Sequence, residues 1–190
     1  MNGLRKKLEK FRRTSEHLVY QNTRIQLFDD DVIQPDGTPG KYVRLCYHDN
    51  PTGAVIVPRM PDGRLLLLKI YRYAVDELSI EFPRGGGHMG ESVLDVARRE
   101  LRTETGLNPV NWRELGYFRP DTAIVMTEVG VLLAELGATA EGECRPQEEE
   151  GISDILFIGP EEVRRWACEG RIRDGFTLGA LGLLWAHETS

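Results

Sequence analysis

Two apolar runs near the middle of the chain constrain the fold most. AVIVP at residues 54–58 and LLLLKIYRY at residues 65–73 are separated by RMPDGR, in which Pro-Asp-Gly is a strong turn signal. Short apolar runs bounded by turn residues are typical of strands inside a sheet. We therefore expect these two segments to be central strands.

The surrounding elements predict an α+β fold. Residues 17–33 and 41–48 are rich in β-forming residues and predict an antiparallel hairpin or meander, and Leu4, Leu8 and Phe11 before them have the spacing of a short amphipathic helix. Further strands are expected at 112–118, 123–136 and 153–159, and helices at 92–105, 160–170 and 176–188. This order predicts a mixed sandwich and not a regular βαβ alternation. The segment at 135–151 is too polar and too rich in Gly and Pro to be core.

Size, charge and cysteine content narrow the class of protein. A chain of 190 residues with 41% hydrophobic residues can bury one substantial core. We expect it at residues 51–190, with residues 1–50 as an N-terminal helix and β extension. The net charge of -6 argues against general binding to nucleic acid or an anionic membrane. Scattered cysteines and the lack of a membrane-spanning run predict a cytoplasmic protein.

Two glutamates stand where the expected helix at 92–105 should be apolar. Projected at about 100° per residue, Glu100 and Glu104 continue the inward stripe of Val93 and Ala97. Two acids four residues apart repel by roughly 0.2–0.5 kcal/mol, and a negative charge in the last turn opposes the helix dipole. Both side chains could reach water at the rim of the apolar face. Alternatively, they could hold a divalent cation, because Mg²⁺ and Mn²⁺ prefer carboxylate oxygens.

The segment from Gly85 to Leu107 resembles the Nudix box, G-x5-E-x7-R-E-U-x-E-E-x-G-U with U apolar. It departs from that pattern at Thr103, which takes the first position of the usual Glu-Glu pair. The resemblance implies an α/β/α sandwich around a mixed sheet, in which the box holds divalent ions that bridge a diphosphate. The threonine implies a site with fewer ions, or one that takes an acid from elsewhere.

The resemblance also implies roles for individual residues of the box. Glu100 and Glu104 match metal ligands for Mg²⁺, or for Mn²⁺ in its place, and the main-chain carbonyl of Arg84 is the expected further ligand. Glu91 and Arg99 match the acid and the arginine that brace the loop and the helix. We place Arg99 with the catalytic residues and Glu91 with those that bind the substrate.

Two other sets of side chains complete the expected site. The acidic run Glu148, Glu149 and Glu150 could supply a general base or a further ligand. We include Glu149 and Glu150 as catalytic candidates and Glu150 also as a metal ligand, although the sequence does not choose among the three. Arg72 and Arg84 are the candidates for binding phosphate, since a guanidinium group forms forked contacts with phosphate oxygens.

Beyond the box, the chain is similar to the ADP-ribose and nucleoside-diphosphate-sugar pyrophosphatase branch. The similarity lies in KIYRYAVDELSIEFPRG, with its Glu-x-Pro-x-Gly, and in QEEEGISDILFIGPEEV; Pro120, however, lies about two residues earlier than the ADP-ribose pattern places its proline. The branch implies Mg²⁺-dependent hydrolysis of a small nucleoside diphosphate derivative to a nucleoside monophosphate and a sugar phosphate. It also implies a homodimer completed by the N-terminal strands. The alternatives are a silent nucleotide-sugar-binding module and a pyrophosphatase for dinucleotides or coenzyme A.

Overall fold

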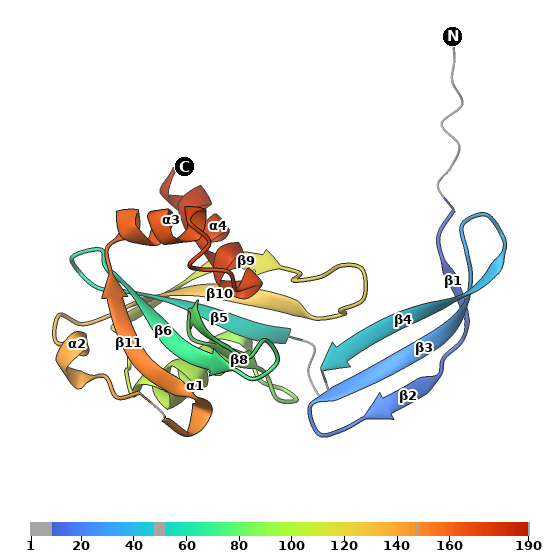
Figure 1. Cartoon of the computed structure of the whole chain (residues 1–190), viewed down its shortest axis with the longest axis horizontal. Coiled ribbons are helices and arrows are strands. Elements are labelled where there is room, and N and C mark those ends of the chain that lie inside the picture. Colours follow the sequence, from blue (N-terminus) through green and yellow to red (C-terminus); the bar gives the residue numbers. More distant parts are fainter. Residues whose placement is uncertain (1–8, 48–51, 147, 190) are drawn as a thin grey trace, which may run out of the picture. The chain divides into compact units, whose positions relative to one another are not determined.

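The computed structural model describes residues 9–47, 52–146 and 148–189. The chain divides into an N-terminal unit, which combines the residues up to 48 with residues 121–126, and a larger unit made of the remainder. Figure 1 labels most of the elements. Their bounds are β1 Arg12–Ser15, β2 Leu18–Gln21, β3 Ile25–Ile33, β4 Pro39–Tyr47, β5 Thr52–Arg59, β6 Leu65–Arg72, β7 Glu77–Glu81, β8 Arg84–Gly86, α1 Val93–Thr105, β9 Asn111–Phe118, β10 Glu128–Glu135, α2 Ala140–Glu143, the 3₁₀ turn η1 Glu148–Glu150, β11 Ile152–Ile158, α3 Pro160–Cys168 and α4 Gly175–Glu188.

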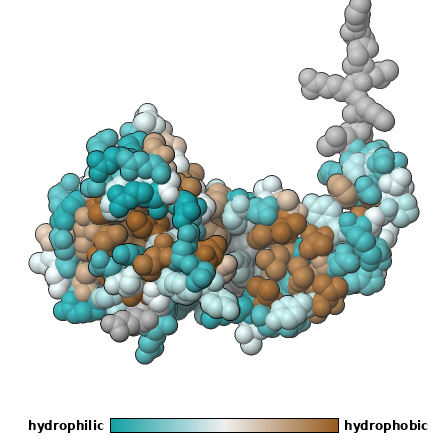
Figure 2. All heavy atoms as spheres, in the orientation of Figure 1, coloured by the Kyte–Doolittle hydropathy of each residue, from teal (hydrophilic) through white to brown (hydrophobic). Residues whose placement is uncertain are grey.

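The N-terminal unit is a four-stranded antiparallel sheet in which β3 pairs with β1, β2 and β4. The tight turn between β3 and β4 needs Gly37, whose φ is 89°, and the side chain of Asp36 accepts the N–H of Thr38 at 2.9 Å. Several large apolar side chains of this sheet are exposed, and Figure 2 shows a brown area over its strands. They are Leu18, Val19, Tyr20, Val43 and Tyr47.

The predicted N-terminal helix falls largely outside the described residues, because Leu4 and Leu8 are not among them. Phe11 is described, and it lies in an irregular segment just before β1. Its ring packs edge-on against the ring of Tyr42, with 5.1 Å between the two centroids. This described part of the segment is therefore attached to the sheet and is not helical.

The larger unit is built on a mixed seven-stranded sheet. Its main order is β11-β6-β5-β10-β9, with β7 paired to β6 and β8 paired to β5. Strand β10 runs parallel to β5, and the other pairs are antiparallel. The two predicted central strands, β5 and β6, are indeed inside the sheet and almost fully buried.

Alternation along β5 explains why both faces of this sheet are covered. Ala54 and Ile56 belong to the hydrophobic cluster that includes side chains of α1, whereas Val55 and Val57 belong to the cluster that includes side chains of α3 and α4. Figure 1 shows α1 on one face of the sheet and α3 and α4 on the other. The predicted α+β fold, a sandwich around a mixed sheet, is confirmed.

Two predicted elements differ in extent. The strand expected at 123–136 begins only at Glu128, because the backbone before it bonds elsewhere: Leu45 donates to the carbonyl of Ile124 at 2.8 Å, and Met126 donates to the carbonyl of Leu45 at 2.9 Å. The polar segment before β11 contains the short helix α2, which buries Ala140 against the core. Among the described residues, no helix is both long and apolar enough to cross a membrane.

Candidate active site

Helix α1 begins and ends as its sequence predicts. The hydroxyl of Ser92 accepts the N–H of Asp95 at 3.2 Å, and Gly106 closes the helix in the left-handed conformation with φ of 77°. Between these caps, Ala97 and Leu101 are fully buried against the sheet. The helix is thereby fixed with one face toward the core, and the two anomalous glutamates lie on or beside that face.

Glu104 is buried without a matching positive charge. The residue is only 3% exposed, and its carboxylate atom Oε2 accepts the backbone N–H of Arg84 at 3.1 Å. The pKa of Glu104 is raised to about 8, mainly by burial and further by the negative charges of Glu100 and Glu150. The N–H of Arg84 and the more distant charge of Arg72 offset only part of it. In the described part of the chain, Glu104 forms no ion pair.

Glu100 lies one turn earlier and packs directly against the backbone of Gly85. A Cβ atom added to Gly85 would stand 2.0 Å from Oε1 of Glu100, so a larger residue here would displace the Glu100 carboxylate from its present position. Burial raises the pKa of Glu100, the charges of Glu150 and Glu91 act in the same direction, and Arg99 opposes them from 2.5 Å away. The surroundings of Glu100 and Glu104 therefore both disfavour the charged form of the carboxyl group.

Glu91 and Arg99 form the brace that the box pattern implies. Nε and Nη2 of Arg99 donate to the two carboxylate oxygens of Glu91 at 3.0 and 3.1 Å, and Nη2 also reaches the carbonyl of Gly86 at 2.8 Å. The backbone N–H of His88 donates to Glu91 at 2.8 Å. The bond to Arg99 is the main reason that the pKa of Glu91 falls to about 2. The brace ties the loop after β8 to the helix.

The structure distinguishes two of the three glutamates of the acidic run. Glu149 and Glu150 are both exposed on η1, and nothing is described of the side chain of Glu148. Glu150 is among the charges that raise the pKa of both Glu100 and Glu104, whereas Glu149 is not among the main ones. Glu150 is therefore the described acid of the run that is electrostatically coupled to the helix pair.

The helix pair suits a cation that the substrate helps to hold. No three Asp, Glu, His or Cys side chains among the described residues converge as a ready-made metal cage. Mg²⁺, however, usually binds through one or two carboxylates together with substrate phosphates. Glu100 and Glu104 supply hard oxygens that lack a full counter-charge, so they fit this kind of site. Thr103 is exposed and adds no charge to it.

Both predicted phosphate-binding arginines are held by a residue that the sequence did not single out. Glu81, at the end of β7, accepts a fork from Arg72, with Nε to Oε1 at 3.0 Å and Nη2 to Oε2 at 2.5 Å. Its Oε2 also accepts Nε of Arg84 at 3.2 Å. The available signal was the Glu-x-Pro-x-Gly pattern, in which this glutamate directly precedes the buried Phe82.

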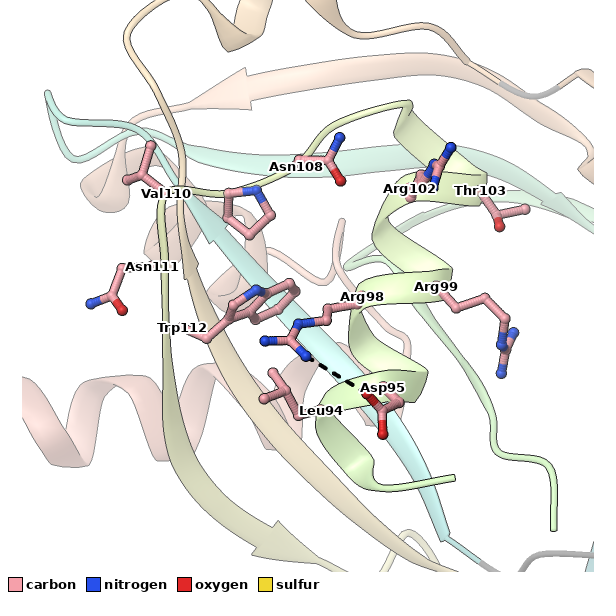
Figure 3. Close-up of a pocket in the computed structure, with 11 residues that line it drawn as sticks. Leu94, Asp95, Arg98, Arg99, Arg102, Thr103, Asn108, Val110, Asn111 and Trp112 are labelled. Carbon is pink, nitrogen blue, oxygen red and sulfur yellow. Dashed lines mark ion pairs between the residues drawn. The ribbon is translucent and has the colours of Figure 1, made fainter. Parts of the chain in front are cut away.

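A surface hollow of about 1150 Å³ lies on the outer side of α1 (Figure 3). In the figure, Arg98 points toward Asp95, with which it forms an ion pair at 3.7 Å, and Trp112 lies beside the Arg98 guanidinium. Glu100 and Glu104 do not line this hollow. The acid pair therefore belongs to the opposite face of the helix, toward β8.

Comparison with known proteins matches this architecture. Residues 49–174 match the model of the NUDIX domain. An ADP-ribose pyrophosphatase of Bacillus subtilis is 26% identical over 171 residues, which are 90% of each chain. An RNA pyrophosphohydrolase of Bartonella bacilliformis is 47% identical over 49 residues, only 26% of this chain and 29% of that protein. A solved structure titled as an ADP compounds hydrolase has a TM-score of 0.77 at 19% identity, covering 97% of this chain and 98% of its own.

The domain match spans most of the chain, and the geometry of residues 85–107 agrees with the box that defines the family. Nudix hydrolases generally use divalent metal ions and act on small nucleoside diphosphate derivatives. The chain belongs to the Nudix family of hydrolases.

Proposed function

We propose that this protein hydrolyses the pyrophosphate bond of ADP-ribose, or of a closely related nucleotide sugar, in a reaction that depends on Mg²⁺. The observation that carries the proposal is the pair Glu100 and Glu104, two inward carboxylates without a full counter-charge on the Nudix helix. The choice of substrate is supported by the ADP-ribose pyrophosphatase of Bacillus subtilis, which aligns over 90% of both chains. Water adds to one phosphorus and the P–O–P bond breaks, so the products are a nucleoside monophosphate and a sugar phosphate.

Each part of the site has a distinct task in this proposal. Glu100, Glu104 and the carbonyl of Arg84 hold the ion, and Mn²⁺ can replace Mg²⁺. When bound, the ion neutralises phosphate charge and lowers the pKa of a bound water. Arg99 and Glu91 keep the loop and the helix in register through their forked contact.

The acidic run and Arg72 act on the reacting groups. Glu150 takes the proton of the attacking water or adds a ligand, since its charge already acts on both helix acids. Glu149 is the second candidate for the same task. Arg72 binds the diphosphate, because its Nη1 donates no hydrogen bond to a described residue.

A substrate panel tests the proposal. Purified protein is incubated with ADP-ribose, other nucleotide sugars, dinucleoside polyphosphates, NADH and coenzyme A, and the products are identified by mass spectrometry. We expect AMP and ribose 5-phosphate from ADP-ribose in Mg²⁺, no turnover in EDTA, and unchanged turnover in Glu135→Gln, which lies at the far end of β10. Binding of ADP-ribose without cleavage would favour a silent binding module, and a preference for dinucleotides or coenzyme A would contradict the substrate class.

We also propose that the protein works as a cytoplasmic homodimer. The exposed apolar side chains of the N-terminal sheet, such as Leu18 and Tyr20, form a surface of the kind that a second copy covers. The three cysteines are free thiols, in keeping with a reducing compartment. Light scattering coupled to gel filtration should give twice the mass of the chain, and Tyr20→Glu should reduce that mass by half.

A further inference from the structure

Glu81 is a buried carboxylate to which the scheme above gives no task. The residue is only 2% exposed, and its two oxygens receive a fork from Arg72 and a further bond from Arg84. Burial alone would raise the pKa of Glu81, but the two guanidinium groups outweigh it and hold that pKa below its usual value. One charged carboxylate therefore fixes two arginines at once.

The two arginines differ in what else they contact. Nη2 of Arg84 also reaches Asp174 at 3.4 Å, and its guanidinium carbon lies 4.4 Å from the ring centroid of Phe176. Asp174 in turn caps α4 by accepting the N–H of Thr177 at 2.8 Å. The side chain of Arg84 thus connects β8 to α4 through these contacts. It is less available than Arg72 to bind a substrate.

The guanidinium of Arg72 is hydrogen-bonded on one edge and has a further donor, Nη1, on the other. Its Nε and Nη2 are both bonded to Glu81, while Nη1 donates to no described residue. The guanidinium is also close enough to the acid pair for its charge to act on Glu104. A phosphate oxygen near the helix acids could therefore be met by Nη1, and the fork would fix the direction of that donor.

The cost of burying Glu81 argues for a role beyond stability. Removing a carboxylate from water costs several kcal/mol, and an ion pair in the interior often stabilises a fold no better than apolar residues of the same volume. The same sheet has a forked pair at its other end, Arg59 with Glu135 at 2.5 Å, where the glutamate side chain is 32% exposed. That pair carries no buried charge and touches no box residue.

We propose that Glu81 is a positioning residue, which holds the guanidinium of Arg72 so that Nη1 meets the diphosphate of the substrate. The inference rests on the proposed function for the identity of the substrate. The contact between Arg72 and the diphosphate does not depend on that identity, because any diphosphate bound at the acid pair would meet the same donor, Nη1.

The test measures affinity without turnover. Binding of α,β-methylene-ADP, a diphosphate that cannot be cleaved between its phosphorus atoms, is measured by calorimetry in Mg²⁺ for the unchanged protein, Glu81→Gln, Arg72→Ala and the double variant. We expect Glu81→Gln to weaken binding about tenfold, the loss of one charge-assisted contact. In the double variant, the substitution at Glu81 should add little to the loss caused by Arg72→Ala, because Glu81 acts through Arg72. With ADP-ribose, KM should rise more than kcat falls.

Controls separate positioning from stability. Glu135→Gln removes the matched fork and should leave the affinity unchanged. If Glu81→Gln fails to fold, Arg72→Lys decides, since lysine keeps the charge but cannot form the fork, and it should also bind about tenfold more weakly. Additive losses in the double variant, unchanged affinity in Glu81→Gln, or no binding by the unchanged protein would each overturn the inference. Binding of the probe without cleavage of ADP-ribose would overturn the proposed function and leave the inference standing.

Discussion

Glu91 and Glu104 belong to the same box of sequence but have opposite electrostatic surroundings. Glu91 accepts Nε and Nη2 of Arg99 and a backbone N–H, and its pKa falls to about 2. Glu104 is buried, receives one backbone N–H, faces two other carboxylates, and has its pKa raised to about 8. The cause of the difference is the partner: one acid has its cation in the protein, and the other does not.

This contrast separates the parts of the box that build the structure from the parts that await a ligand. An acid with a built-in partner stabilises the fold at neutral pH and has little left to offer a metal ion. An acid whose charge is disfavoured by burial is mostly protonated at neutral pH, and a bound cation favours its charged form. Glu100 lies between these cases, because Arg99 contacts it but does not compensate its burial.

The largest effect should come from changing the acid that lacks a partner. Glu104→Gln keeps the shape of the side chain but removes a metal ligand, so kcat/KM for ADP-ribose should fall about a thousandfold, as expected when several kcal/mol of charge stabilisation are lost from a metal site. Steady-state kinetics in Mg²⁺ measures this loss. The fold should not suffer, and in EDTA the variant should unfold at the same temperature as the unchanged protein or a higher one. A variant that keeps more than a tenth of the activity would remove Glu104 from the list of ligands.

The helix and its two inward acids could be predicted from the sequence, but the contacts that give the acids different surroundings could not. The turn at residues 59–64, the helix at 92–105 and the inward direction of its two acids are local properties, so pattern and spacing were enough to predict them. The role of Glu81 and the coupling of Glu150 depend on which strands and loops meet in space. A single chain does not encode these distances in any short motif. The strand before Glu128 was misjudged for the same reason, since its hydrogen bonds go to the distant Leu45.

The pH dependence of the metal-free protein should show the same contrast at a smaller scale. The pKa of Glu104 is raised from 4.5 to about 8, so the folded state binds more protons than the unfolded state between these values. The free energy of unfolding in EDTA should therefore fall as the pH rises through this window, by a few kcal/mol and at most about 5 kcal/mol. Chemical denaturation at a series of pH values measures it.

Two comparisons make this pH dependence specific. Glu104→Gln has no proton to lose at that position, so most of the decline should disappear. Saturating Mg²⁺ should also flatten the curve, because the ion binds the charged carboxylates and stabilises the folded state. A decline of equal size in the variant would assign the effect to other groups and contradict the view that the buried acid dominates.

The smallest effect should come from the acid that already has its partner. Glu91→Gln weakens the fork to Arg99, and the free energy of unfolding at neutral pH should fall by about 1 kcal/mol, the scale of a partly exposed charged hydrogen bond. The sign is opposite to that for Glu104: the pKa of Glu91 is lowered from 4.5 to about 2, so its contribution is present above pH 4.5 and is lost as the pH falls toward 2. The variant and the unchanged protein should therefore converge in stability at acid pH. Activity should drop far less than in Glu104→Gln, since the helix acids Glu100 and Glu104 remain. A loss of activity as large as in Glu104→Gln would mean that the brace acts on the reacting groups directly and that Glu91 and Glu104 share one task.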